Sequence, residues 1–438
     1  IGVAAIILTN LILLPILLSY VKLGEGYRLG MLSRAKMLGG VWDTFAVVSH
    51  KKPALIIIVA SALLAGLGYW KGSEIRIGDL HQGVPEFHAD SIYNKDTKVI
   101  TDRFSIGVDV LSVMAETKKD GCIDYDVMRD IDRFAWTISN VEGVQSVISL
   151  AGIARVINAG WNEGNLKWRE LSRNQHVMVQ SVAYVPTSTG LLNKDCSVMP
   201  VLVFTRDHKA ETIKRIIDEV KTYRTQYASG QVSYQLAGNN VGVMAATNEA
   251  VEEAQFPILV YVFAAIIVLC LLTFRSFSAM LCVVIPLALV SLLSYALMAW
   301  LEIGLKVNTL PVVALGVGIG VDYGIYIFSR MQGLMRQGLN YREAYRLTLS
   351  ITGSGVIFTA VILAMGVMTW VFSDLKFQAD MGIMLTFMFL VNMLGAIVLL
   401  PALAAWLLPD KCEVKPDTDT SEVEAFIKGD QEIHCKQG

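Results

Sequence analysis

The sequence predicts a polytopic α-helical membrane protein that carries one extracytoplasmic α+β domain of the ferredoxin-like, split β-α-β kind. Three observations predict this fold class: long apolar stretches recur along the chain, one long polar insert at residues 71–255 interrupts them, and basic residues gather in alternate loops. Only 17% of the 438 residues are charged, against about 25% in ordinary soluble domains. The net charge of −2 and the lack of a basic patch give no indication of a nucleic-acid partner.

Seven stretches are apolar enough to cross a bilayer, which takes about 20 residues of helix. They are residues 1–20, 53–70, 256–273, 278–300, 308–330, 350–372 and 380–408. Trp70, Trp300, Trp370 and Trp406 stand at span ends, where amphipathic aromatic rings favour the membrane–water interface. We expect the last five stretches to form a five-helix bundle over 256–408.

The short loops predict the orientation, because lysine and arginine accumulate in cytoplasmic loops. Under strict alternation all the strongly basic loops fall on one side, with Lys22, Arg28, Arg34, Lys36, Lys51, Lys52, Arg275, Arg330, Arg336, Arg342 and Arg346. The opposite loops hold one lysine each, Lys306 and Lys376. The sequence therefore predicts that the insert lies outside the cytoplasm and that the acidic tail 409–438 lies inside.

Residues 21–52 are expected to form a cytoplasmic linker. Within it, 41–48 ("VWDTFAVV") places Val41, Trp42, Phe45 and Val48 on one helical face with basic residues around it. This pattern favours an amphipathic helix lying in the membrane interface over an ordinary connecting segment.

Two short segments resemble each other across the whole chain. Residues 8–19 read "LTNLILLPILLS" and residues 394–405 read "LGAIVLLPALAA", with Pro15 and Pro401 in matching places. Internal repeats are a common way of building transporters. We therefore expect the span at 1–20 to be the last span of a preceding half, and the whole polypeptide to be about two repeats long.

The insert contains two β-α-β patterns. The first has strand-like 108–117 and 144–150 around a helical 124–140, and the second has 198–205 and 232–238 around 209–227. Two such units predict a ferredoxin-like porter domain. Residues 151–195, between the halves, are expected to form an irregular cap.

Cys122 follows the first expected strand and Cys196 precedes the third. The first strand points away from the membrane and the third runs antiparallel beside it, so both cysteines should lie at the distal end. In an oxidising compartment this favours a disulfide over two free thiols. The other cysteines, Cys270, Cys282, Cys412 and Cys435, have no zinc-ligand spacing, and the six histidines are scattered. No metal site is expected, and the histidines should be surface or capping residues.

Residues 316–330, "GVGIGVDYGIYIFSR", place an acid inside a span. Gly316, Gly318 and Gly320 do not make a nucleotide-binding loop, because G-x-G-x-x-G would need glycine where Val321 stands. An aspartate near mid-bilayer costs about 2.5–3.5 kcal/mol on insertion scales, so Asp322 should face a protein interior.

Small residues and hydroxyls near Asp322 complete the expected site. Gly316, Gly320 and Gly324 form a small-residue stripe for close helix packing, and Ser354 and Thr359 of the next span could support the acid. Asp322 is then either a hydrogen-bonded packing residue or a group that binds and releases protons. The second hypothesis is favoured, since the sequence offers no nucleotide motif to power transport.

These features resemble the resistance–nodulation–division (RND) superfamily, in its MMPL branch. That resemblance covers residues 1–408 and is carried by the topology and by "GIGVDYGIYIFSR". It implies that Asp322 and Tyr323 form a proton relay with H⁺ as the coupling ion and no cofactor. It also implies that this chain is the C-terminal half of a transporter whose first half holds a second such pair.

The resemblance further implies proton-motive-force-driven export of hydrophobic or lipid-like molecules across a bacterial inner membrane, with the large domain in the periplasm. Its partners would be membrane lipids, the substrate, the N-terminal half of the same chain and either further copies or accessory periplasmic proteins. Two alternatives stay open: a SecD/SecF-type protein-translocation factor and a Patched-like sterol-sensing protein. An enzyme is not expected, because no catalytic constellation can be placed.

Overall fold

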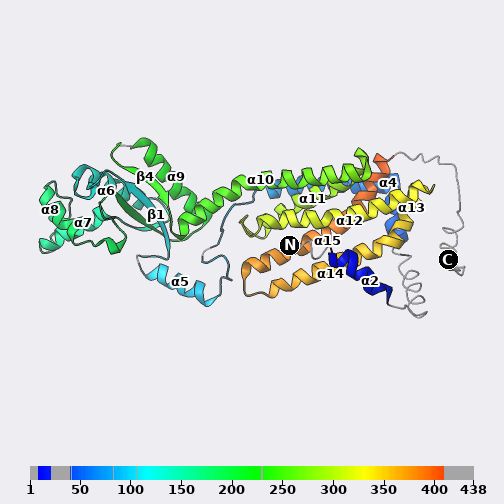
Figure 1. Ribbon diagram of the computed structural model, residues 1–438, viewed down its shortest axis with the longest axis horizontal. Coiled ribbons are helices and arrows are strands. Elements are labelled where there is room, and N and C mark those ends of the chain that lie inside the picture. The colour runs from blue at the N-terminus through cyan, green and yellow to red at the C-terminus, as the bar shows by residue number, and fades with distance from the viewer. Residues whose placement is uncertain are drawn as a thin grey trace.

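The computed structural model describes residues 8–20, 40, 42–81, 83–104, 106–227 and 230–408. Long helices form a bundle that continues on one side into a small α+β domain (Figure 1). Among the described residues, six helical stretches are long and apolar enough to cross a membrane. The predicted fold class, a helical multi-pass membrane protein with a small α+β domain, is confirmed.

Each of the six stretches overlaps one of the predicted spans, and the first predicted span, 1–20, holds a shorter apolar helix at Thr9–Ser19. The six stretches are α4 (Lys51–Gly72), α10 (Asn239–Phe274), α11 (Phe277–Trp300), α12 (Leu310–Arg336), the stretch Tyr341–Phe372 built from α13 (Tyr341–Thr348), η6 (Leu349–Gly353), α14 (Ser354–Met368) and η7 (Thr369–Phe372), and the stretch Lys376–Leu407 built from α15 (Lys376–Leu394), η8 (Gly395–Leu399) and α16 (Leu400–Leu407). Their buried side chains form one apolar core.

Helix α10 extends well beyond the expected span at 256–273. It runs without a break over 36 residues, or about 54 Å at 1.5 Å per residue, and continues from the bundle to the sheet domain (Figure 1). The predicted boundary at 255 between domain and span is therefore the middle of a single helix. A continuous helix with Pro257 near its middle, rather than a linker, connects the two parts of the molecule here.

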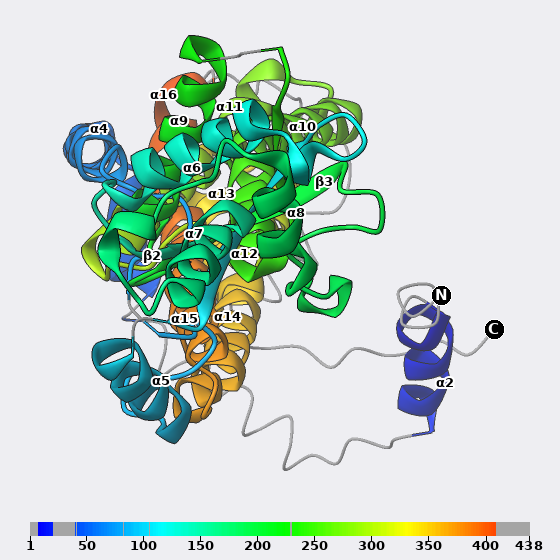
Figure 2. The same cartoon turned by 90° about the vertical axis from the view of Figure 1, so that its left-hand side faces the viewer.

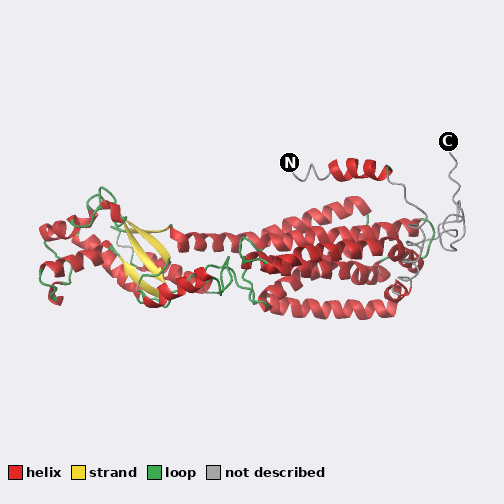
Figure 3. Cartoon of the chain, turned by 90° about the horizontal axis from the view of Figure 1, so that it is seen from below, coloured by secondary structure: helices red, strands yellow, loops and turns green. Residues whose placement is uncertain are grey.

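The α+β domain has the predicted strand and helix order. Its strands are β1 (Asp109–Glu116), β2 (Val144–Ile148), β3 (Val198–Thr205) and β4 (Ser233–Ala237), and its two main helices are α6 (Tyr125–Ser139) and α9 (Ala210–Gln226). The sheet order is β2-β3-β1-β4, with every neighbouring pair antiparallel. This is the order of two interlocked split β-α-β units, and Figure 3 shows the strands grouped at one end of the molecule.

The segment expected to be an irregular cap is instead largely helical. It contains α7 (Leu150–Trp161) and α8 (Gln175–Ala183), each beginning at a capping side chain, Ser149 and Asn174. Both side chains act as N-caps, which short polar side chains favour. A further helix, α5 (Ile92–Arg103), precedes β1, and no pattern in the sequence had indicated it.

The apolar face expected on an interfacial helix contacts protein in the structure. Trp42 is buried, and Phe45 and Val48 pack beside it on the core of the bundle. The Trp42 ring lies against Gly353 of η6. Val41 lies outside the described residues, as do most of the linker 21–52 and the tail 409–438.

The two segments with the repeated sequence also share a local geometry. Near each, a five-residue π-helix leads into an α-helix that carries proline in its first turn: η1 (Thr9–Leu13) into α2 (Leu14–Ser19), and η8 into α16. The π-helices begin at residues 9 and 395, 386 positions apart. Helix α2 stands apart from the bundle in two views (Figure 2, Figure 3), whereas α16 packs against α4 and α11.

The proline of the second copy frees a carbonyl, and a tyrosine takes it up. Pro401 has no N–H to donate to the carbonyl four residues earlier, that of Ile397. The Tyr345 hydroxyl donates to this Ile397 oxygen, and Tyr341, one turn earlier on α13, donates to the Pro401 oxygen. Both tyrosines are buried, so the irregular turn is satisfied from a neighbouring helix.

His208 departs from the expectation that the histidines are surface or capping residues. It is 4% exposed, and its Nδ1 lies 3.0 Å from Asp109 Oδ2 at the start of β1. Burial lowers the pKa of His208, but the hydrogen bond to Asp109 and the charges of Asp109 and Asp79 outweigh it, so the pKa is raised above its ordinary value near 6.5. No periodicity in the sequence could have paired these residues, which are 99 positions apart.

We expect this pair to make the stability of the domain pH-dependent. A raised folded-state pKa stabilises fully below about pH 6.5 and loses that contribution as the pH rises through the folded value. His208→Gln should therefore cost roughly 1.5–3 kcal/mol at pH 5.5, the range for a hydrogen bond to a charged group, and much less above the raised pKa. Thermal unfolding of the α+β domain, recorded at a series of pH values, measures this difference in stability. His176→Gln, at an exposed position on α8, is the control, and parallel pH profiles for wild type and His208→Gln would contradict the expectation.

Candidate functional site

Helix α12 carries the candidate site, and its buried face is the glycine stripe. A Cβ atom built on Gly316 would overlap Met388, and one built on Gly320 would overlap Asn392, both on α15. At Gly324 it would meet Val283 of α11 at 3.1 Å. The expected helix-packing stripe thus lies against α15 and α11, and side chains larger than hydrogen would push these helices apart.

Two buried polar side chains lie on this packed face. Asn392 Nδ2 donates to the Gly316 carbonyl at 3.0 Å, while its Oδ1 atom has no hydrogen-bond partner among the described residues. Tyr323 is 2% exposed, and its hydroxyl also lacks a partner within that part of the chain. A buried polar atom without a partner is unfavourable by about 1–3 kcal/mol. The sequence indicated Tyr323 through its neighbour, but no pattern singled out Asn392.

Asp322 lies on the opposite, exposed face of α12. Successive residues on a helix are about 100° apart, so the burial of Tyr323 turns Asp322 away from α15. Six positions of this face are exposed, recur with helical spacing and are covered by no helix of the described residues: Pro311, Leu315, Gly318, Asp322, Tyr326 and Ser329. We call these six residues the open stripe.

The protein interior expected around Asp322 is therefore not formed by the described residues of this chain. The sequence showed that the acid was too costly to face lipid but could not show which part of the protein covers it. The space beside Asp322 is open within the described residues, since a Cβ on Gly318, about one turn earlier, would meet nothing within 4 Å.

The hydroxyls expected to support the acid do not contact it. Ser354 and Thr359 are both exposed on α14, and within the described ranges no hydrogen bond or ion pair joins Asp322 to either of them or to Tyr323. The structure thus places the acid and the tyrosine on two faces of one helix. Any partner of Asp322 must approach from outside the described chain.

The expected disulfide partners lie together at the distal end of the sheet. Cys122, in the turn after β1, and Cys196, in the loop before β3, form a disulfide with a Cα–Cα distance of 5.4 Å. The backbones around them also pair, Asp120 N donating to Asp195 O and Thr117 N to Ser197 O. Cys270 and Cys282 are free and buried in the bundle. No group of His, Cys, Asp and Glu in the described residues could hold a metal ion.

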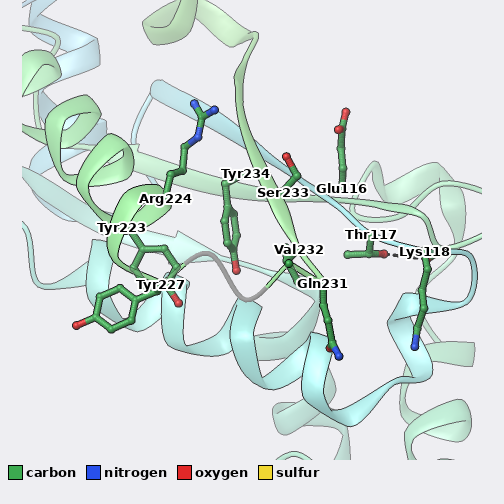
Figure 4. Close-up of a pocket in the computed structure, with 11 residues that line it drawn as sticks. Glu116, Thr117, Lys118, Tyr223, Arg224, Tyr227, Gln231, Val232, Ser233 and Tyr234 are labelled. Carbon is green, nitrogen blue, oxygen red and sulfur yellow. Dashed lines mark hydrogen bonds between the residues drawn. The ribbon is translucent and has the colours of Figure 1, made fainter.

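Two cavities lie in the α+β domain. The larger, of about 530 Å³, opens at the distal end between β4 and the end of α9, where Tyr223, Tyr227 and Tyr234 gather (Figure 4). The smaller, of about 330 Å³, is enclosed by three elements: the segment that follows α4, helix α9 and the N-terminal half of α10. Its apolar lining comes from Ile75, Ile77, Leu80, Ile213 and Ile217, and charged residues including Arg76, Lys214 and Glu252 surround it.

Six membrane-length helices among the described residues, an α+β domain continuous with one of them and an acid within a span define a multi-pass membrane protein with one α+β domain. The chain belongs to the MMPL family, whose model matches residues 107–422.

Individual relatives match shorter stretches. The "Probable transport protein MmpL12" of Mycobacterium tuberculosis is 30% identical over 105 residues, 23% of this chain and 9% of that protein. The "Sulfolipid-1 exporter MmpL8" of the same organism is 32% identical over 87 residues, 20% of this chain and 8% of that protein. The "Membrane protein YdfJ" of Bacillus subtilis is 24% identical over 88 residues, which are 20% of this chain and 12% of that protein. The alignments thus span a small part of these relatives' own length.

Proposed function

We propose that this chain is the C-terminal half of a proton-motive-force-driven exporter of hydrophobic or amphipathic, lipid-like molecules. The observation that carries the proposal is Asp322, an acid halfway along a membrane-length helix on a face that the described chain leaves uncovered. In a span, an ionisable group of this kind is by default a candidate for proton transfer. The membrane potential acts on a charge carried there with about 2.3 kcal/mol per 100 mV.

The open stripe is where the preceding half would pack. A second acid–tyrosine helix against it would remove Asp322 from lipid and provide the partner that α12 itself does not. H⁺ is the proposed coupling ion, with Asp322 as the carrier and Tyr323 as a second polar group behind it. The proposed location is a bacterial inner membrane, with the α+β domain in the periplasm as the basic loops indicate.

An amphipathic substrate suits the smaller cavity of the domain. Its apolar lining can bind a hydrocarbon chain, and the charged residues around it can bind a polar head group. It adjoins the end of α4 and the long helix α10, both of which lead to the bundle. The name of the relative MmpL8 as a sulfolipid exporter supports the same class of substrate.

Proteoliposomes containing the full-length protein test the proposal. With a labelled amphiphile inside and an imposed proton gradient, we expect outward movement of the label that stops when a protonophore dissipates the gradient. Flux that is unchanged without the gradient would contradict proton coupling. Sterol binding without any flux would favour the Patched-like alternative, and dependence on an unfolded polypeptide would favour the SecD/SecF type.

A further inference from the structure

The segment that leaves α4 is bonded to two parts of the molecule at once. Residues 75–80 run between the loop that leads into α12 and the start of α9 in the α+β domain. Gly78 N donates to Leu305 O at 2.8 Å, and Leu305 N donates to Arg76 O at 2.9 Å, so a short parallel bridge joins segment and loop. Leu305 is fully buried at this bridge.

An ion pair closes the same contact. Lys306 Nζ pairs with Asp79 Oδ1, and their side chains are 26% and 10% exposed. Partly buried pairs of this kind are screened far less than surface pairs. Gly304 allows the close approach, since a Cβ at this position would overlap the Gly78 carbonyl.

On its other side the segment holds the domain. Asp79 O accepts from Ala210 N, the first residue of α9, at 2.9 Å. Arg76 forms an ion pair, at 2.8 Å, with Glu211, the residue after Ala210. The carboxylate of Asp79 also acts on buried His208, immediately before α9. Asp79 therefore contacts the loop before α12 through its side chain and the α+β domain through its backbone.

The loop in turn is fixed to α12. Lys306 N donates to Thr309 Oγ1 at 2.8 Å, Thr309 Oγ1 donates to Gly304 O at 3.2 Å, and Leu310 N donates to Lys306 O at 2.8 Å. From Leu310 the helix runs unbroken to Asp322, twelve residues or about 18 Å further. A displacement of α12 along its axis must move Lys306 with it.

We propose that the Asp79–Lys306 pair, with the bridge at Leu305, is the positioning link that passes changes in the protonation of Asp322 to the α+β domain. The inference rests on the proposed function, in which Asp322 carries the proton. Proton binding removes the charge of Asp322, α12 shifts to the arrangement that suits the neutral acid, and the loop moves segment 75–80 and α9 with it. The loop 373–376, which leads into α15, is bonded to residues 86–88 instead, through Lys376 N to Glu86 O and His88 Nε2 to Ser373 O. The domain is thus linked to α12 and α15 by separate contacts.

Hydrogen exchange at the Gly78 and Leu305 amides reports on the link directly, because each donates across it. In the full-length protein in lipid nanodiscs, Asp322→Asn imitates the neutral acid permanently. We expect the exchange rate at both amides to differ from wild type by at least about fivefold, the lower end of usual coupling between sites. Lys306→Gln should abolish this difference, whereas Lys306→Arg, which keeps the charge, should preserve it.

Lys71→Gln is the matched control. It also breaks an ion pair near the end of α4, with Glu74, but that pair joins the last turn of α4 only to the turn directly after it, and its side chains are 38% and 49% exposed. It should leave the response to Asp322→Asn intact. Unchanged exchange at both amides in Asp322→Asn, or a full response that persists in Lys306→Gln, would overturn the link. Because exchange needs no substrate, proton-driven flux without an amide response would refute the link alone, and an amide response without flux would refute only the transport proposal.

Discussion

Asp322→Asn should reduce export by the full-length protein to the level measured without a proton gradient. An amide has nearly the shape of the acid but cannot alternate between a charged and a neutral form. The variant should insert and fold at least as well as wild type, since it removes an acid that costs about 2.5–3.5 kcal/mol near mid-bilayer. Flux in energised vesicles at matched protein amounts measures the effect.

The neighbouring tyrosines provide the comparison. Tyr323→Phe should be milder than Asp322→Asn, because it removes a buried hydroxyl that has no partner among the described residues and leaves the acid in place. Tyr326→Phe, one turn from Asp322 on the open stripe, is the control and should transport normally. Export near the wild-type rate by Asp322→Asn would leave Asp322 with a packing role and disprove its role as proton carrier.

Removing the Cys122–Cys196 disulfide should destabilise the α+β domain by roughly 4 kcal/mol. The bond closes a loop with a sequence separation of 74, and on the chain-entropy model a closed loop of this length restricts the unfolded chain by about that amount. Thermal unfolding of the α+β domain, with and without reductant, measures this change in stability. The two single serine variants and the double variant should agree with each other and with reduced wild type.

Agreement among these variants is the sharp part of the test, because each of them loses the same bond. If the two single effects instead added up in the double variant, the thiols would be contributing separately through packing. A reductant that left the wild-type unfolding temperature unchanged would also contradict the bond's contribution.

The sequence predicted the parts of this structure that depend on local pattern. The bounds of the spans follow from uninterrupted apolar runs, and the strands β1 to β4 follow from short β-branched segments around amphipathic helices. Cys122 and Cys196 could be brought together from strand direction alone. In each case neighbouring residues carried the information.

Features that depend on distant residues could not be predicted in the same way. The exposed position of Asp322 depends on which face of α12 packs on α15, and both faces of that helix are apolar enough to be buried. Asn392, Lys306 and Asp79 are single polar residues whose partners lie 76 to 227 positions away. The glycines and asparagines of 151–195 predict an irregular cap, but asparagine also favours helix N-termini.

The proline turn between η8 and α16 restricts how this sequence can change over evolutionary time. While Pro401 is present, it offers no N–H to the Ile397 carbonyl, and phenylalanine at position 345 would remove the hydroxyl that now donates to that carbonyl. Once an ordinary residue at 401 restores the missing N–H, the same loss of the hydroxyl becomes tolerable. The two positions therefore form an ordered pair in which the proline has to be replaced first, so a family lineage can leave this arrangement through one sequence of substitutions far more easily than through the reverse.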